Sequence, residues 1–346
     1  MENTKLFVSL VNGTGSKFTD NYDKNYLLNE NIVQDRNRTS SIYEDIALTV
    51  VYSVFCLLGI IGNGLVIWFG IFRIQKTVNV IWFLSLALAD FSFTFLLPLN
   101  ITQILLKYWA FETFTCKLTQ LVLCINLIVS VLQITVISLD RCICVMLPVW
   151  CHNHRRPRLA FIIVLIIWIG SIALSLPFIV YSDIAEIHEL MICTLKIDES
   201  DWAMKTMLDL VLFFLLPFII IVSCYIVIVL YSKKKRIFAS SRPLKTIAAV
   251  IIAFFICWFP IRLFTLLLTF EGRLFDFYSV YYGFLITNLL IVLNSCINPI
   301  LYVFIGRDFK EKFWGSFQAT LEKAFIEEDK SASEKQERCT ALQSLQ

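Results

Sequence analysis

Seven long apolar runs set what this chain can fold into. They lie at about 46–70, 79–105, 116–147, 159–180, 204–231, 244–269 and 277–305. Each is long enough to cross about 30 Å of hydrocarbon as a helix, and a bilayer favours helices because the backbone must satisfy itself there. With 58% hydrophobic and 16% charged residues among 346, the chain is too apolar for a typical soluble enzyme or DNA-binding domain. We therefore predict an all-α membrane protein, a seven-transmembrane helix bundle without a nucleic-acid partner.

The segments outside the runs predict the domain organisation. Residues 1–45 are polar and lack the apolar core of a signal peptide, so we expect an extracellular disordered tail. The bundle is expected to span 46–305, followed by a short amphipathic eighth helix over 306–320 and a cytoplasmic tail over 321–346. Sequons for glycosylation begin at Asn12 and Asn37, and they matter only if this end is outside the cell.

Basic residues near the ends of the runs predict the orientation. The loops after the first, third and fifth runs hold Arg73, Lys76, Arg155, Arg156, Arg158, Lys233, Lys234, Lys235, Arg236, Arg242 and Lys245, and the intervening loops hold Lys107, Lys196 and Arg273. The positive-inside rule then places the N-terminus outside, and we expect a multi-pass protein of the plasma membrane. The outer loops are acidic, which favours cationic ligands or cationic ends of peptides, although ordinary loop solubility explains the acids equally well.

Polar residues inside the apolar runs are candidates for function, because a charge in a span is costly. Asp90 lies in the middle of the second run. Amides and hydroxyls at similar depth on other runs are Asn63, Asn126, Ser130, Asn294, Ser295 and Asn298. Such a set could hold a hydrated cation or share a proton, and a hydrogen-bonded structural cluster is the alternative.

The pair Asp140-Arg141 closes the third run at the predicted cytoplasmic border. Adjacent opposite charges there could lock each other in one state and release in another. A snorkelling anchor is the simpler interpretation of the same pair.

Two of the eleven cysteines differ from the rest, which lie mostly within the runs. Cys116 begins the third run and Cys193 lies in the second outer loop. Both are on the predicted oxidising side, where a disulfide between them is permitted and would hold the loop over the helix end.

Catalytic and metal-binding interpretations find little support. The three histidines are in loops, and no zinc-protease, serine-hydrolase or phosphate-loop motif occurs. Cys151, His152 and His154 could form a metal site, but we interpret them as loop residues that face solvent. A transporter is the main rival class, but the two halves of the sequence show no repeat. We expect no enzyme activity and no metal ion apart from a cation at the Asp90 set.

An ordered set of motifs gives the chain a family resemblance. The set comprises Gly62-Asn63, Leu86-Ala87-Leu88-Ala89-Asp90, Cys116, Asp140-Arg141-Cys142, Trp168, Pro217, Tyr225, Cys257-Trp258-Phe259-Pro260 and Asn298-Pro299-Ile300-Leu301-Tyr302. Each motif falls in its expected run, and together they cover residues 46 to about 320. In this respect the chain resembles a rhodopsin-like G-protein-coupled receptor.

A narrower resemblance rests on the segments around the third, sixth and seventh runs. These are Asp140-Arg141-Cys142-Ile143-Cys144-Val145, Leu147-Pro148-Val149-Trp150, Asn153-His154-Arg155, Ser240-Ser241-Arg242-Pro243-Leu244 and 301–309. They resemble the chemoattractant group, with formyl peptide receptors the closer match and chemerin receptors next. The resemblance implies an extracellular peptide or lipid mediator and an inhibitory-class G protein, with chemotaxis and calcium mobilisation in inflammation. It also implies arrestin and a receptor kinase as partners.

The resemblance implies ligand-binding positions that this chain fills differently. Receptors for formylated peptides carry an acid on the third span and two arginines on the fifth. Here those positions fall at Cys124, Lys205 and Asp209. Arg262 on the sixth run is a candidate replacement charge that pairs with Asp209, and a Lys205–Asp209 pair one helical turn apart is the alternative.

The resemblance also implies a mechanism. A ligand above Trp258 would favour outward movement of the sixth span about Pro260, and the residues that rearrange toward the G protein would be Asp140, Arg141, Tyr225, Pro299 and Tyr302. Asp90, Asn126, Ser130, Asn294 and Asn298 would bind sodium and favour the resting state. A non-signalling or scavenging receptor is the first alternative function, and a transporter is the second.

Overall fold

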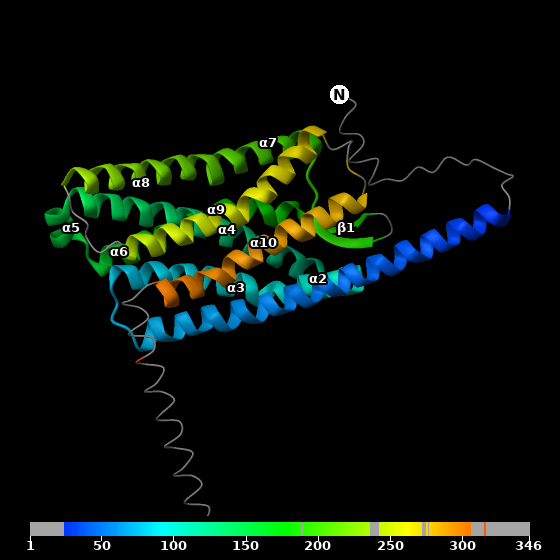
Figure 1. Ribbon diagram of the computed structural model, residues 1–346, viewed down its shortest axis with the longest axis horizontal. Coiled ribbons are helices and arrows are strands. Elements are labelled where there is room, and N and C mark those ends of the chain that lie inside the picture. The colour runs from blue at the N-terminus through cyan, green and yellow to red at the C-terminus, as the bar shows by residue number, and fades with distance from the viewer. Residues whose placement is uncertain are drawn as a thin grey trace, which may run out of the picture.

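The computed structural model describes residues 24–187, 190–235, 242–271, 275, 277–305 and 315. Long helices run side by side along one axis and form an elongated bundle (Figure 1). The helices are α2 (Lys24–Phe72), α3 (Val78–Leu106), α4 (Thr113–Met146), α5 (Pro148–His154), α6 (Pro157–Tyr181), α7 (Glu199–Leu210), α8 (Leu216–Lys235), α9 (Arg242–Glu271) and α10 (Phe277–Ile305).

Seven segments are long and apolar enough to cross a membrane. They are Tyr43–Phe72, Val78–Leu106, Thr113–Met146, Pro157–Tyr181, Asp201–Lys234, Ile251–Glu271 and Ser279–Ile300. Each overlaps one predicted run, which confirms the predicted seven-span helical architecture. The eighth helix expected over 306–320 and the tail over 321–346 lie outside the described residues, apart from Gly315.

The first helix begins within the segment predicted as an N-terminal tail. We expected residues 1–45 to lack regular structure, but α2 begins at Lys24 and projects well beyond the bundle (Figure 1). Once a membrane span supplies a helix nucleus, each added residue gains one hydrogen bond at little further cost. The polar composition of 24–45 therefore did not end the helix. The prediction for residues 1–23 falls outside the described part of the chain.

The outer loop after α6 forms a β-hairpin that the hydropathy pattern did not predict. Strand β1 (Ser182–Ile187) pairs antiparallel with β2 (Leu190–Leu195), and Ile184 lies opposite Cys193. Cys193 is bonded to Cys116 at the start of α4, with 5.6 Å between their Cα atoms. This confirms the predicted disulfide and places the hairpin over the end of α4.

The short helix α5 at the opposite end was also not predicted. It begins at Pro148, where a missing N–H costs nothing because the first helical N–H has no partner within the helix. The hairpin lies near the right-hand end of the bundle in Figure 1 and α5 near the left-hand end. The two loops thus mark opposite ends of the molecule.

Helices α3 and α4 form the centre of the bundle. In their most apolar windows 56% and 61% of residues are buried inside the protein, against 28–33% for the other spans. The other helices expose Leu, Ile, Val and Phe on their outer faces, as expected for helices whose solvent is lipid. The central pair is therefore where polar groups can be enclosed.

The fifth span is irregular where it passes the core. Residues Val211–Leu215 form a π-helical turn, named η1, between α7 and α8, and Pro217 is the second residue after it. Such turns bend a helix and frequently occur at functional sites. Phe214 in this turn packs edge-on against Phe255 of α9 at 5.3 Å between ring centroids.

Candidate functional site

The hairpin caps the end of the bundle that is predicted to face outward. The backbone N–H of Trp109 donates to the carbonyl of Met191 at 2.6 Å, and Trp109 packs with the disulfide in a small apolar cluster. Asp183 on β1 accepts from Lys196 Nζ at 2.9 Å. That contact, with the backbone N–H of Ile184, holds the pKa of the exposed Asp183 carboxyl below its usual range. One of the outer acids is therefore already paired.

Below the hairpin, three charged side chains meet between the fifth and sixth spans. Lys205 Nζ lies 2.6 Å from Asp209 Oδ2, and Arg262 Nη1 lies 3.4 Å from the same oxygen. Both predicted pairings of Asp209 thus occur together. They bring α7 and α9 into contact, and a second tie joins Trp202 Nε1 to Thr269 Oγ1 at 3.2 Å.

This triad lies next to Trp258, which was predicted to lie beneath the ligand. The Arg262 guanidinium carbon lies 5.9 Å from the centroid of the Trp258 ring. Arg262 is 9% exposed, and its Nε has no hydrogen-bond partner among the described residues. Cys124 of α4 lies close enough to interact electrostatically with all three charges. All five predicted ligand-binding residues are therefore brought into one region.

The composition of this region decides what it can hold. Among the described residues, two cations and one carboxylate leave an excess of one positive charge here, and the Arg262 Nε–H has no acceptor. The ammonium of Lys205 also lies 5.1 Å from the Phe178 ring centroid. An arrangement of this kind can accept an anionic group flanked by aromatic surface.

Deeper in the bundle, Asp90 is fully buried and is held by three donors. Asn126 Nδ2 donates to Asp90 Oδ1 at 3.0 Å, Ser295 Oγ donates to Oδ1 at 2.8 Å, and Asn298 Nδ2 donates to Oδ2 at 2.8 Å. Three spans, α3, α4 and α10, therefore converge on one carboxylate. Sequence reasoning selected Asp90, Asn126 and Asn298 as ligands but placed Ser295 only among their neighbours.

Several oxygens near this carboxylate remain without a hydrogen bond. They are buried and have no partner among the described residues: Asn126 Oδ1, Ser130 Oγ, Asn294 Oδ1 and Asn298 Oδ1. Ser130 follows Asn126 by one helical turn, and Asn294 precedes Asn298 by one turn, so each pair shares a helix face. No ion pair to Asp90 occurs in the described part of the chain. These oxygens and the Asp90 carboxylate suit a hard cation, because such ions prefer oxygen ligands.

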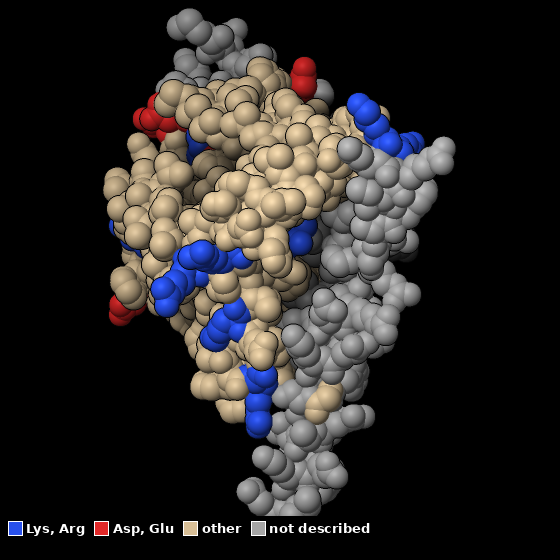
Figure 2. All heavy atoms as spheres, turned by 90° about the vertical axis from the view of Figure 1, so that its left-hand side faces the viewer, with Lys and Arg blue, Asp and Glu red and all other residues tan. Residues whose placement is uncertain are grey.

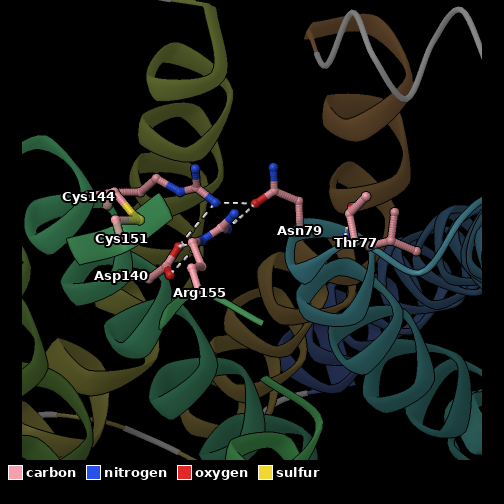
Figure 3. A network of polar contacts seen from close by, with 8 residues as sticks. Thr77, Asn79, Asp140, Cys144, Cys151 and Arg155 are labelled. Carbon is pink, nitrogen blue, oxygen red and sulfur yellow. Dashed lines mark hydrogen bonds and ion pairs between the residues drawn. A yellow bond between two sulfur atoms is a disulfide. The ribbon is translucent and has the colours of Figure 1, made fainter. Parts of the chain in front are cut away.

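At the opposite end, the predicted Asp140-Arg141 pair belongs to a larger network (Figure 3). Arg141 Nη2 lies 3.2 Å from Asp140 Oδ2 and donates to Asn79 Oδ1. Arg155 reaches both acceptors as well, with Nε 2.9 Å from Asp140 Oδ1 and Nη2 2.7 Å from Asn79 Oδ1. Two guanidinium groups thus share one carboxylate and one amide oxygen.

The remaining predicted switch residues lie between these two ends. Tyr225 of α8 has a buried hydroxyl without a partner among the described residues. Pro260 lies inside α9 and Pro299 inside α10, and a Cβ added at Gly62 would lie 3.2 Å from Pro299. Tyr302 falls in α10, but its side chain is outside the described residues, as are the side chain of Asn37 and all of Asn12.

The end of the bundle that carries α5 is basic (Figure 2). Lys and Arg are spread across it with few acidic side chains in view. The described basic residues that follow the inner ends of the helices are Arg73, Lys76, Arg155, Arg156, Arg158, Lys233 and Lys234. This concentration of Lys and Arg at one end is the pattern that the positive-inside rule describes.

Two features of the inner end were missed by sequence reasoning. Asn79 and Arg155 lie 76 residues apart, and no helical or charge pattern connects them. Cys144 and Cys151 form a second disulfide, although we expected Cys151 to be a solvent-facing loop residue. It is instead buried at 8% exposure, while His152 and His154 are exposed as predicted. The described residues include no cluster of His, Cys, Asp and Glu suited to a metal.

Comparison with known proteins agrees with this geometry. Residues 62–302 match the family model described as "7 transmembrane receptor (rhodopsin family)". The chain is 38% identical to Chemerin-like receptor 1 of Homo sapiens over 322 residues, covering 86% of this chain and 85% of the relative. It is 39% identical to Formyl peptide receptor 2 of Mus musculus over 306 residues, covering 82% and 87%. It is also 39% identical to N-formyl peptide receptor 3 of Homo sapiens over 302 residues, covering 82% and 86%.

These matches confirm the predicted family, whose members are receptors and not enzymes. The chemerin-like and formyl peptide receptors are nearly equally similar to the chain, at 38% and 39% identity. A multi-pass membrane protein with an extracellular ligand and a G-protein partner follows from them. The chain belongs to the rhodopsin family of G-protein-coupled receptors and is related to the chemerin-like and formyl peptide receptors.

Proposed function

We propose that the chain is a chemoattractant-type receptor that binds a peptide, or a lipid mediator, outside the cell and activates an inhibitory-class G protein inside. Chemotaxis and calcium mobilisation would follow. The observation that carries this proposal is the charged triad of Lys205, Asp209 and Arg262 above Trp258, at the end opposite Arg141. The names of the relatives, which refer to chemerin and formyl peptides, support a peptide ligand.

The triad suggests which part of the ligand lies deepest. Its excess positive charge favours a carboxylate, such as the C-terminus of a peptide or the acid group of a lipid mediator. Receptors for formylated peptides carry arginine at two positions on the fifth span. This chain has Lys205 and Asp209 there, and these side chains cannot make the same bidentate contacts as two arginines. We therefore propose a ligand whose anionic end, rather than a formyl group, reaches Arg262. The acidic outer loops would suit cationic residues elsewhere in the same peptide.

Signal transfer would run from Trp258 along α9. A ligand that prefers the active state would shift the two-state balance by its difference in affinity, and Pro260 would allow the inner half of α9 to move. Arg141 would then leave Asp140 and Asn79 for the hydroxyl of Tyr225, which has no partner in the described part of the chain. Pro299 and Tyr302 on α10 would take part in the same rearrangement.

A sodium ion beside Asp90 would stabilise the resting state. A buried carboxylate without a cationic partner is costly, and the unpartnered oxygens of Asn126, Ser130, Asn294 and Asn298 supply further ligands. When bound, the ion would supply the missing positive charge. The residues themselves would tie α3, α4 and α10 together, which opposes the movement that activation requires.

We also propose a plasma-membrane receptor with its N-terminus outside, glycosylated at Asn12 and Asn37. The basic α5 end supports this orientation. The cytoplasmic tail would be phosphorylated by a receptor kinase and would bind arrestin.

Cells that express the tagged chain provide the test. Formylated and non-formylated peptides with free or amidated C-termini are added, and cyclic AMP is measured with and without a toxin that blocks inhibitory-class G proteins. We expect a fall in cyclic AMP that the toxin and Arg141→Ala abolish at equal surface amounts, with amidated peptides much weaker. Internalisation without any G-protein response would support a scavenging receptor instead, and ligand flux that survives Arg141→Ala would support a transporter.

A further inference from the structure

The two disulfides lie at opposite ends of the bundle and close rings of different size. Cys116 and Cys193 are 77 residues apart in sequence, whereas Cys144 and Cys151 are only 7 apart. A large ring restricts the unfolded chain more than a small ring does, so a small ring acts mainly on local geometry. The Cys144–Cys151 bond therefore affects how α5 lies on α4 more than it affects the stability of the fold.

The inner pair also lies in a different chemical setting. Cys144 is one turn beyond Arg141, at the end where this family couples to G protein, and thus faces the cytosol. Glutathione keeps most thiols there reduced, and the disulfides that do form are usually transient or redox-sensing. The Cα atoms of the pair are 5.1 Å apart, within the normal range for a disulfide. The thiols are therefore placed to form the bond without backbone movement.

The bond bears directly on the position of Arg155. The N–H of Cys151 donates to Leu147, and the N–H of Arg155 donates to Cys151, each at 2.9 Å. Arg155 thus follows Cys151 by one helical turn. Its side chain extends from the end of α5 to Asp140 (Figure 3). A bond between Cys151 and Cys144 therefore fixes the backbone from which the Arg155 side chain extends to Asp140.

We propose that Cys144 and Cys151 are a redox-responsive thiol pair whose oxidation locks α5 against α4 and holds Arg155 on Asp140. With hydrogen peroxide as oxidant, the half-buried Cys144 thiolate attacks one peroxide oxygen, the O–O bond breaks, and sulfenic acid and hydroxide form. The Cys151 sulfur then attacks the Cys144 sulfur, the S–O bond breaks, and a second hydroxide leaves. With the two thiol protons the balance is two thiols plus one peroxide to one disulfide plus two waters. Two molecules of a small thiol such as glutathione reverse it, becoming oxidised to their own disulfide.

The direction of the effect follows from competition for Asp140, and it rests on the proposed G-protein coupling. Arg155 and Arg141 share Asp140 Oδ2, at 3.1 and 3.2 Å, and their like charges repel. When Arg155 is held in place, Arg141 is restrained less strongly. Oxidation should therefore favour the release of Arg141 and raise ligand-free coupling.

The test uses the full chain in lipid nanodiscs, treated with hydrogen peroxide or with reduced glutathione. Mass spectrometry detects the peptide that links Cys144 to Cys151, and amide hydrogen exchange is followed over residues 148–156. We expect oxidation to slow this exchange about tenfold and to raise ligand-free nucleotide exchange on an inhibitory-class G protein about fivefold. Cys144→Ser and Cys151→Ser should each abolish both responses. Cys142→Ser, a free cysteine on the same helix, should retain both, and all variants keep the outer disulfide.

The readouts separate this inference from the proposed function. If the linked peptide does not form, or if hydrogen exchange over 148–156 is equal in both redox forms, the inference is wrong whatever the G protein does. It is also wrong if the reduced receptor couples and oxidation leaves its coupling unchanged. If oxidation slows hydrogen exchange but neither form drives nucleotide exchange, the redox lock is supported while the proposed coupling fails.

Discussion

Arg155 holds Asp140 through two of its nitrogens, with Nε at 2.9 and 3.2 Å from the two carboxylate oxygens and Nη2 at 3.1 Å. Arg141, the immediate neighbour of Asp140, has only a single contact with the same carboxylate, at 3.2 Å. A bidentate pair is the stronger of the two arrangements. Arg155 therefore neutralises much of the Asp140 charge that would otherwise restrain Arg141.

Removing this competitor should strengthen the resting state. In Arg155→Ala, Asp140 pairs with Arg141 alone, so ligand-free nucleotide exchange on an inhibitory-class G protein should fall about fivefold. Arg158→Ala removes a nearby exposed charge and should leave the rate within experimental error. Equal exchange in Arg155→Ala would show that Arg155 does not compete for Asp140, and faster exchange would show that the loop restrains the receptor.

Asp90→Asn should abolish the response to sodium. In the unsubstituted receptor, replacing sodium by a large organic cation should raise ligand-free nucleotide exchange about fivefold, because the ion ties α3, α4 and α10 together. In the variant the rate should be the same in both salts. Equal salt responses of the two proteins would exclude Asp90 as the sodium ligand.

Asp209→Leu should destabilise the protein, because it leaves Arg262 buried without its carboxylate partner. An unpaired buried polar group costs about 1–3 kcal/mol, so thermal unfolding of the purified receptor should shift to lower temperature. Lys205→Ala should shift it less, since that ammonium is 24% exposed and Asp209 keeps Arg262. The double variant with Arg262→Leu should recover stability. A double variant that is less stable than Asp209→Leu would argue against this account of the triad.

Two glycines test how closely the helices approach. A Cβ at Gly283 would overlap the Phe264 ring, with Cε2 at 2.7 Å and Cε1 at 2.9 Å, and Phe284 packs edge-on against that ring. Gly283→Ala should therefore cost about 1–3 kcal/mol through overpacking. Gly170→Ala, where nothing lies within 4 Å, should not lower the unfolding temperature. The same loss at both positions would mean that helix packing is not the cause.

Much of the architecture could be predicted because it depends on length and hydropathy. A membrane span needs about 20 apolar residues, and the seven runs met that requirement at sites that hardly depend on tertiary contacts. The Lys205–Asp209 pair was likewise predictable from a spacing of one helical turn. The hairpin Ser182–Leu195 was not, because its two strands lie in one loop between spans, and their contacts with Trp109 and the disulfide form only when the helices pack.

The inner network shows where such reasoning ends. Asn79 lies at the start of α3 and Arg155 just after α5, and their contact depends on how the helices pack. Residues 244–269 of the sixth run contain no Asp or Glu, and Arg141 is held instead by Asn79 and Asp140. The same limit applies to Ser295, which reaches Asp90 only because α10 presents that face to α3.

Nucleotide exchange by a purified inhibitory-class G protein, with the receptor in nanodiscs, tests the central claim most directly. We predict that the chain accelerates exchange without added ligand, that an activating peptide from the cell assay increases the rate, and that Arg141→Ala removes both effects while the protein remains folded. Exchange no faster than the G protein alone, or acceleration that persists in Arg141→Ala, would contradict a receptor that couples through the inner end of α4.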